Sequence, residues 1–404
     1  MPALKYWLWV SGADISVRAK AMLIKHYGSA EAAFYTPEGD FRYVKGLTAA
    51  DAALLERRDT RRASEIAEAC IRQGIQIITM QDAAYPKRLR NIYDPPVVLY
   101  VKGRLPDVDD NALISVIGTR KPSFYGEKMC RDLSYQISRS GGIVVSLLTQ
   151  GIDRRAAEAA LLAGRPCVGV LGTPHELERG DLAQDVAAHG ALISEYAPGT
   201  ARQNQFFRER NRVAAGLSVG VVVVEAPERS GTRLFVLDAI DQGKEIFAVP
   251  GNADASNSAG TIALIKEGAK LVTSGAEVMS EFEGLYPDKI RLSSELPPEN
   301  GFVAEQMARP PVYDEKKKRP VEQKSVDKEN GRGYIDLKEQ LAALSEPQLQ
   351  IIAAIDKNAS HIDDIIEATG LSAATVLAQL TVLEIKGYVR REAGRRFILN
   401  TAKK

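Results

Sequence analysis

Hydrophobic residues in the middle of the chain fall into short continuous runs, which alternate with stretches that have helical spacing. Several runs are rich in β-branched residues and contain almost no polar alternation, as expected of strands buried on both faces of a sheet. Alternation of such strands with helices predicts an α/β domain with a doubly wound, mainly parallel sheet, which we place at residues 109–285. The expected strands are 112–117, 142–146, 167–171, 191–194, 219–224 and 245–249, and the expected helices are 128–139, 155–163 and 234–241.

Residues 1–108 have a different pattern and are predicted to form a helical module with a connecting strand at 97–101. Helical spacing runs over 15–33, 49–57 and 61–73. Thr48 is a good N-cap for the second of these helices, and Gly46 allows a tight hairpin before it. Gly74 is expected to end the third helix.

The C-terminal part of the chain changes composition twice. Prolines and the charged run 314–320 give residues 286–340 the composition of a solvated linker. Over residues 341–404, helical patterns return at 345–356, 362–369 and 373–386, and a β-hairpin is expected at 388–398. Three helices with a helix-turn-helix, followed by a hairpin, predict a winged-helix domain.

Composition argues against several classes of protein. Of 404 residues, 45% are hydrophobic and 26% are charged, which is typical of a globular protein. Three cysteines and four histidines are scattered without the spacing of a disulfide framework, a metal site or a His-based triad. We therefore expect no metal and no cofactor. No secretory signal or membrane-spanning run is recognisable, so a cytoplasmic protein without membrane contact is expected.

Glycine, serine, threonine, asparagine and arginine recur at the carboxyl ends of the predicted strands, where open parallel sheets bind ligands. Amides, hydroxyls and guanidinium groups bind phosphate oxygens there, so we favour a phosphate-bearing ligand over a purely structural role for these loops. Because the net charge is only +1, such a site must be a local patch. The candidate residues are Gly118, Thr119, Arg120, Lys121, Ser146, Arg208, Arg210, Asn211, Arg212, Ser230, Gly231, Pro250 and Gly251.

The strand-end segments also follow the order of motifs in a known family. They include Ile117-Gly118-Thr119-Arg120, Gly151-Ile152-Asp153, Ser194-Glu195-Tyr196, Arg210-Asn211-Arg212, Val224-Glu225-Ala226, Ser230-Gly231 and Phe247-Ala248-Val249-Pro250-Gly251. In these motifs the chain resembles the DNA-processing protein A family (DprA, also called Smf) over the whole α/β domain. The resemblance implies an extended Rossmann-like sheet, an N-terminal helix-hairpin-helix or SAM-like module and a C-terminal winged helix.

The resemblance also implies a function. Members of this family are non-enzymatic proteins that bind single-stranded DNA and dimerise. They displace single-strand-binding protein and load the RecA recombinase onto the strand during natural transformation. Carried over by position, the DNA contacts are Gly118, Thr119, Arg120, Ser146, Arg210, Asn211 and Arg212, with Pro250 and Gly251 at the border. Phe124, Phe206 and Phe207 are candidate platforms for bases, with core packing as the alternative.

Several positions depart from the family pattern. Leu147 stands where the family has glycine, and its side chain would hinder a close approach of ligand to backbone. Gln150 replaces an arginine, although Arg154 and Arg155 lie nearby. We therefore expect a reshaped pocket. The other departures are Phe235, for a threonine, and Thr173-Pro174-His175, for a Tyr-Pro element.

Two other functions stay open. The sheet also resembles that of the lysine-decarboxylase-like phosphoribohydrolases, so a nucleotide-binding or nucleotide-hydrolysing protein would use Glu195 or Glu225 as acid or base. However, Pro250-Gly251-Asn252-Ala253 lacks the second glycine and the catalytic glutamate of that motif. A transcription regulator would read bases with helix 373–386, in which Gln379 is the only amide. We expect no catalytic residue, and a protein-contact or weak phosphate-contact role for the winged helix.

Overall fold

The computed structural model describes residues 4–292 and, in the C-terminal part, 346–355, 360–373, 375–376, 379–380, 383, 389–392 and 396–399. The chain divides into two compact units, Met1–Asp314 and Glu315–Lys404. Of the predicted linker 286–340, only residues 286–292 are described; residues 293–340 lie outside the described residues.

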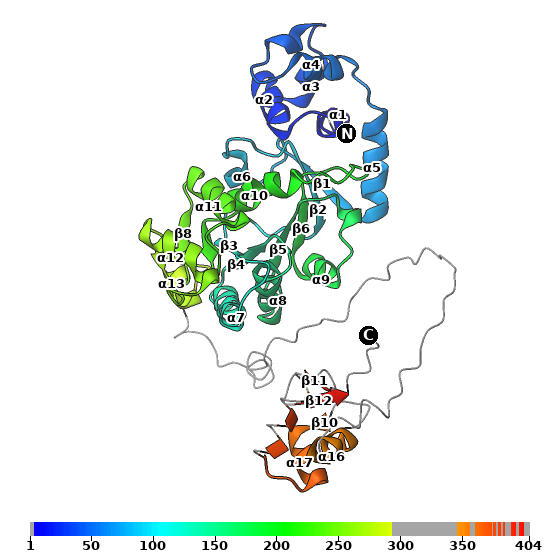
Figure 1. Cartoon of the computed structure of the whole chain (residues 1–404). Coiled ribbons are helices and arrows are strands. Elements are labelled where there is room, and N and C mark those ends of the chain that lie inside the picture. Colours follow the sequence, from blue (N-terminus) through cyan, green and yellow to red (C-terminus); the bar gives the residue numbers. More distant parts are fainter. Residues whose placement is uncertain are drawn as a thin grey trace, which may run out of the picture. The chain divides into compact units, whose positions relative to one another are not determined.

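A nine-stranded sheet forms the centre of the first unit (Figure 1). Its strand order is β1-β2-β6-β5-β4-β3-β7-β8-β9, and all neighbours from β6 to β9 pair in parallel. The mainly parallel α/β fold is therefore confirmed. The strands are β1 (Ile75–Thr79), β2 (Val98–Gly103), β3 (Leu113–Ile117), β4 (Ile143–Ser146), β5 (Cys167–Leu171), β6 (Ala191–Ser194), β7 (Gly220–Val223), β8 (Glu245–Ala248) and β9 (Lys270–Leu271).

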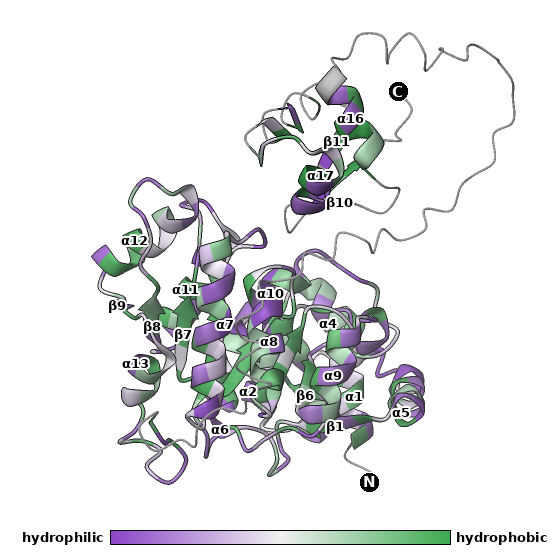
Figure 2. Cartoon of the chain, turned by 90° about the horizontal axis from the view of Figure 1, so that it is seen from below, coloured by the Kyte–Doolittle hydropathy of each residue, from purple (hydrophilic) through white to green (hydrophobic). Residues whose placement is uncertain are grey.

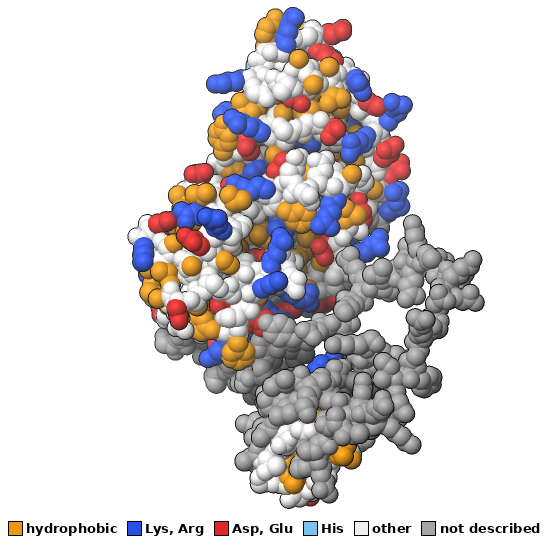
Figure 3. Space-filling view, in the orientation of Figure 1, with side chains coloured by type: hydrophobic (Ala, Val, Ile, Leu, Met, Phe, Trp, Pro, Cys, Tyr) orange, Lys and Arg blue, Asp and Glu red, His pale blue; other side chains and the backbone are white. Residues whose placement is uncertain are grey.

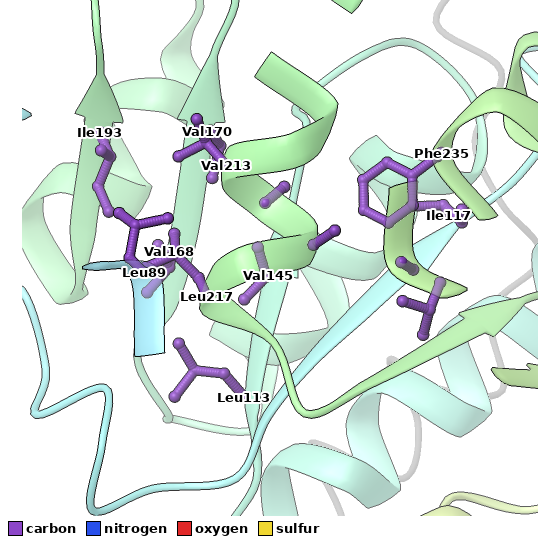
Figure 4. Close-up of a cluster of buried hydrophobic side chains, with 14 of the residues drawn as sticks. Leu89, Leu113, Ile117, Val145, Val168, Val170, Ile193, Val213, Leu217 and Phe235 are labelled. Carbon is purple, nitrogen blue, oxygen red and sulfur yellow. The ribbon is translucent and has the colours of Figure 1, made fainter. Parts of the chain in front are cut away.

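Helices cover both faces of this sheet because its strands are apolar on both sides. In β3, Leu113 and Ile117 pack into one core cluster, whereas Ile114 and Val116 pack into the cluster on the opposite face. Figure 4 shows part of the first cluster, in which Val213 and Leu217 lie near Val145 and Val168. The helices packed on this side are α6 (Lys87–Arg90), α10 (Phe206–Leu217), α11 (Gly231–Asp241) and α12 (Ala259–Lys266).

The second face is covered by amphipathic helices. In α7, Cys130, Leu133 and Ile137 are buried at helical spacing, and Figure 2 shows hydrophilic residues along its outer side. The helices on this face are α7 (Phe124–Arg139), α8 (Ile152–Leu162), α9 (Asp181–His189) and α13 (Gly275–Ser280). The predicted helices at 128–139, 155–163 and 234–241 correspond to α7, α8 and α11; α9, α10, α12 and α13 were not predicted as helices.

The N-terminal module is helical, as expected, and packs against β1 and β2. Thr48 caps α4 in a capping box with Asp51, and Gly74 ends α5 in the left-handed conformation, so both expected caps are confirmed. Gly46 has φ +96°, as the tight hairpin requires. The stretch 15–33 is interrupted at Gly28. The helices are α1 (Leu4–Gly12), α2 (Val17–Tyr27), α3 (Ala30–Phe34), α4 (Ala49–Glu56) and α5 (Arg61–Gln73).

Residues 1–108 also contribute to the central sheet. The strand predicted at 97–101 is β2, and it pairs antiparallel with β6 and with β1. Strand β1 was not predicted; it follows Gly74 directly and places Ile75 and Ile78 in apolar clusters. The sheet thus extends into the segment that the sequence assigned to a separate module. Position 108 as a domain boundary stays a prediction.

The second unit has the winged-helix architecture that the sequence predicts. Helices α16 (Glu346–Ala354) and α17 (Ile362–Thr369) pack together, and β11 (Val389–Glu392) and β12 (Arg396–Leu399) form the hairpin. A short strand, β10 (Ser360–His361), pairs with β12. Of the predicted helix 373–386 only part is described, and its Val376, Leu380 and Leu383 lie in the apolar core of this unit.

Candidate nucleic-acid interface

The strand order identifies one switch point in the sheet. From β3 the chain proceeds through β4, β5 and β6 in one direction, and then returns to β7 on the other side of β3. The loops that leave β3 and β7 therefore diverge, which creates the crevice where open α/β sheets bind ligands. Of the predicted residues, Gly118, Thr119, Arg120 and Lys121 lie in the loop after β3.

Hydrogen bonds join the loops after β3, β7 and β8 into one platform. The Thr119 amide donates to the Glu225 carbonyl at 2.7 Å. The amide and hydroxyl of Ser123 donate to the Glu225 carboxylate at 2.9 and 2.5 Å. Asn257 of the loop after β8 donates to the Lys121 carbonyl at 3.1 Å. A Cβ at Gly118 would lie 2.8 Å from the Glu225 carbonyl oxygen, so a side chain there would disturb this platform.

Two basic side chains of this platform are exposed to solvent. Arg120 and Lys121 are exposed, and within the described part of the chain neither has an ion-pair partner. On the face shown in Figure 3, basic and acidic side chains are interspersed over the described residues. A polyanion would therefore be attracted by a local group of cations and not by a uniformly basic surface.

Beneath the loop, Arg210 and Asp153 form a buried charged cluster. Arg210 is 5% exposed and donates to the Leu147 carbonyl at 3.0 Å, and Asp153 accepts a hydrogen bond from the Thr149 hydroxyl. Burial lowers the pKa of Arg210 to about 10 and raises the pKa of Asp153 to about 6. The positive charges of Arg210 and Arg120 act in the opposite direction and lower the pKa of Asp153.

The three arginines of the Arg-x-Arg-x-Arg stretch do not converge on one site, because the stretch lies on α10. Residues two apart on a helix point about 200° away from each other. Arg208 pairs with Asp238 of α11, and Arg212 makes a bidentate pair with Glu195 at 2.7 and 2.9 Å. Asn211 is buried. Only Arg210 faces the loops after β3 and β4, so the placement of Arg208 and Arg212 does not support a direct phosphate contact.

Ser146 is engaged inside the protein. It is fully buried; its hydroxyl donates to the Asp153 carbonyl at 2.7 Å and accepts from the Leu148 amide at 3.0 Å. Leu147 is half-buried against the core, and its carbonyl holds Arg210. In this loop Leu148 and Gly151 have positive φ, +53° and +90°, whereas Leu147, at the position where the family has glycine, does not. Ser146 therefore shapes the loop instead of presenting its hydroxyl to a ligand.

The remaining predicted residues lie around the platform. Pro250 accepts a hydrogen bond from the Tyr125 hydroxyl at 2.8 Å, and a Cβ at Gly251 would lie 2.1 Å from the Ser258 hydroxyl. Ser230 occupies the N-cap of α11, next to exposed Gly231. Its hydroxyl is buried and has no hydrogen-bond partner among the described residues.

The candidate aromatic platforms differ in exposure. Phe206 is buried and stacks on Tyr196 at 3.8 Å, so it belongs to the core. Phe207 is half-buried, and the guanidinium carbons of Arg202 and Arg210 lie 4.9 and 5.4 Å from the centroid of its ring. Phe124 is 66% exposed beside the loop after β3. Two further residues at this edge were not predicted from the sequence: Arg202, whose guanidinium group lies over the Phe207 ring, and Tyr125, which donates to the Pro250 carbonyl. Their only signal in the sequence is their position, since Arg202 lies four residues before Phe206 and Tyr125 directly follows Phe124.

Other expected charges are already paired. Arg154 and Arg155 both bind Glu158, and Arg155 also lies 3.7 Å from Glu127, so they do not replace the cation lost at Gln150. The two strand-end carboxylates, Glu195 and Glu225, are occupied by Arg212 and Ser123. In the described residues no group of three potential metal ligands lies together, and no helix is long and apolar enough to cross a membrane.

Together, the nine-stranded, mainly parallel sheet and the C-terminal winged helix define a Rossmann-like α/β protein that also carries a winged-helix domain. The family model described as DNA recombination-mediator protein A matches residues 76–283, and the DprA winged helix domain matches residues 336–395. The first of these matches begins at β1. The chain therefore belongs to the DNA recombination-mediator protein A (DprA) family.

Individual relatives agree with this assignment. DNA processing protein DprA of Bacillus subtilis is 38% identical over 213 residues, which are 52% of this chain and 72% of that protein. Protein Smf of Synechocystis is 30% identical over 334 residues, 80% of this chain and 79% of that protein. The X-ray structure of DprA from Streptococcus pneumoniae superposes with a TM-score of 0.59 at 32% identity, covering 69% of this chain and 96% of that one.

Proposed function

We propose that this protein binds single-stranded DNA at the switch point and acts in the cytoplasm as a recombination mediator without covalent chemistry. The observation that carries the proposal is the pair of exposed cations, Arg120 and Lys121, on the platform formed by the loops after β3, β7 and β8. A strand of any sequence would bind through its phosphates, with salt-dependent affinity.

In this proposal the predicted residues have different roles. Arg120 and Lys121 contact phosphates directly, whereas Gly118 and Thr119 hold their loop against Glu225. Arg210 adds positive potential from below and positions the loop after β4 through the Leu147 carbonyl. Ser230 and Gly231, at the start of α11, and Pro250 and Gly251 border the path of the strand. Phe124 and Phe207 are the aromatic surfaces on which bases would stack.

Membership in a recombination-mediator family supports the next step, in which the bound strand passes to RecA while single-strand-binding protein is displaced. We infer that this occurs during natural transformation.

The winged helix takes a protein-contact or weak phosphate-contact role, because Gln379, the only amide of its third helix, accepts a hydrogen bond from Gln348 of α16 at 2.8 Å. A residue engaged in this way is not presented to a base edge.

The test is a charge reversal at the platform. Arg120→Glu/Lys121→Glu should weaken binding of a dT oligomer about 100-fold at low salt and reduce the salt dependence, because two phosphate contacts are lost. Fluorescence anisotropy across a salt series measures both quantities. The control Lys25→Glu/Arg72→Glu reverses the same number of exposed charges in the helical module. Equal binding by the platform variant and the control would refute the site.

We also propose a homodimer. Leu234, Leu237 and Ile240 recur every three residues on α11, and they are 44%, 46% and 53% exposed. A stripe of large apolar side chains on one helix is unusual on a monomer surface and fits a self-complementary interface. Leu237→Glu/Ile240→Glu should shift the protein from dimer to monomer in analytical ultracentrifugation. A wild-type monomer, or a dimer in the variant, would contradict this interface.

A further inference from the structure

We propose a second binding site, for phosphate groups, at the amino end of the sheet. Arg139, Arg165, Lys289 and Arg291 line a cleft of about 350 Å³ together with Gly141 and Asp288. Arg139 and Gly141 precede β4, and Arg165 precedes β5, so the cleft lies at the opposite end of these strands from the loops of the switch-point platform.

The backbone around this cleft is tightly built. The Arg291 amide donates to the Ser140 carbonyl at 3.0 Å, and Ile290 is 4% exposed in the core. Gly141 has φ +95°, and a Cβ there would lie 2.0 Å from the Lys289 carbonyl oxygen. Only glycine allows the segment after α13 to approach α7 this closely. Lys289 and Arg291 are therefore held in place on either side of the buried Ile290.

The opposite wall is also fixed by the fold. Gly164 adopts φ +69° at the end of α8, and the Arg165 amide donates to the Ala160 carbonyl at 3.3 Å. The short turn that follows α8 therefore sets the position of Arg165 directly before β5. Segments distant in sequence thus bring their cations to the same cleft.

Cations outnumber acids among the side chains that line this cleft. Arg165, Lys289 and Arg291 are exposed and have no ion-pair partner within the described residues, and Asp288 is the only acid that lines the cleft. Some exposed arginines on other surfaces do pair with neighbouring acids, as in Arg61–Asp59, Arg154–Glu158 and Arg233–Glu267. Clustered cations repel one another unless an anion joins them.

Arginine side chains favour one class of anion here. The guanidinium group presents a planar fork of N–H donors that matches phosphate oxygens, and a lysine adds a point charge. The ligand is therefore a phosphate group, from either a nucleic-acid backbone or a free phosphorylated molecule. If the phosphate belongs to a nucleic acid, the inference rests on the proposed function, because the same DNA strand would then continue beyond the switch-point platform. The binding of a phosphate group as such does not depend on the proposed function.

The first arm of the test uses pyrophosphate and the full chain. Isothermal titration at low salt should show binding that falls at least about tenfold in Arg165→Glu/Arg291→Glu. The control Lys25→Glu/Arg72→Glu, which reverses two exposed charges in the helical module, should retain it. Arg165→Ala/Arg291→Ala, with an unchanged melting temperature, separates loss of the site from loss of folding. Absence of pyrophosphate binding in the wild type, or equal binding in the Arg165 and Arg291 variants, would overturn the proposal.

The second arm identifies the source of the phosphate. If DNA occupies the cleft, Arg165→Glu/Arg291→Glu should weaken binding of a long dT oligomer and lower its salt dependence, while a short oligomer is unaffected. If both oligomers bind as they do to the wild type but pyrophosphate does not, the ligand is a free phosphorylated molecule. A wild type that binds pyrophosphate but no DNA would refute the proposed function and leave this site standing.

Discussion

The loop after β3 and helix α10 both bring cations to the carboxyl edge of the sheet, but they use them differently. Arg120 and Lys121 in the loop are exposed and have no ion-pair partner among the described residues. On α10, Arg212 has a side chain 12% exposed in an ion pair with Glu195, and Arg210 is buried and donates to the Leu147 carbonyl. Arginines at the same edge thus have opposite roles: those in the loop are available to a ligand, whereas those in the helix hold the scaffold in place.

The largest effect on stability is expected when the Arg212–Glu195 ion pair is broken. Glu195→Ala would leave the Arg212 side chain, which is only 12% exposed, without its partner carboxylate. Breaking a buried pair in this way typically costs about 3–5 kcal/mol of unfolding free energy. Urea denaturation, followed by fluorescence of the buried Trp7 and Trp9, measures the loss. Glu195→Leu/Arg212→Met should recover most of it, and an equally unstable double variant would contradict this role.

The second test concerns Asp153 and pH. Because burial raises the pKa of Asp153 to about 6 in the folded protein, the folded state retains this proton at a pH where the unfolded chain has released it. Its contribution to stability is complete below about pH 4 and is lost as the pH rises through about 6, at most about 3 kcal/mol. Asp153→Asn should remove this part of the pH dependence in urea titrations at pH 4 to 7. Parallel curves for variant and wild type would show that Asp153 does not titrate in this range.

The smallest effects are expected at the exposed cations. Arg208, with a side chain 45% exposed, pairs with Asp238, and Arg208→Ala should cost no more than about 1 kcal/mol. Arg120→Ala should change the unfolding free energy by no more than about 0.5 kcal/mol, since the side chain has no described ion-pair partner to lose. The same urea titration measures both. A loss at Arg120 as large as that at Glu195 would show that the loop arginine also belongs to the scaffold.

Much of the fold could be predicted from the chain itself. The six predicted strands of the α/β domain correspond to β3–β8 within one residue at each end. Strand β1 was missed because Ile75, Gln76 and Ile77 follow a helix directly and form too short a pattern to stand out. Helix α10 was missed because its charged first half hides the buried spacing of Phe206, Arg210 and Val213.

The candidate site was predicted less completely than the fold. Residue types at strand ends predicted a site at the carboxyl edge of the sheet, which stays a prediction, whereas the motif order predicted the family, which is confirmed. However, Ser146 and Arg212 were expected to contact DNA, and the structure engages both in internal bonds. The directions in which the side chains of α10 point, and the hydrogen-bond partner of the buried Ser146 hydroxyl, cannot be predicted from the residues next to them in the sequence.

The sequence by itself determined the buried strands, the helical and winged-helix flanks and the family, because these depend on local apolar patterns and short motifs. Only the tertiary structure decided that β7 lies beside β3, and therefore which loops meet. It also decided which cations are neutralised and which face solvent. The physical reason is that strand pairing and charge pairing join residues far apart in the chain, so the free energy that fixes a site arises from contacts that no single segment contains.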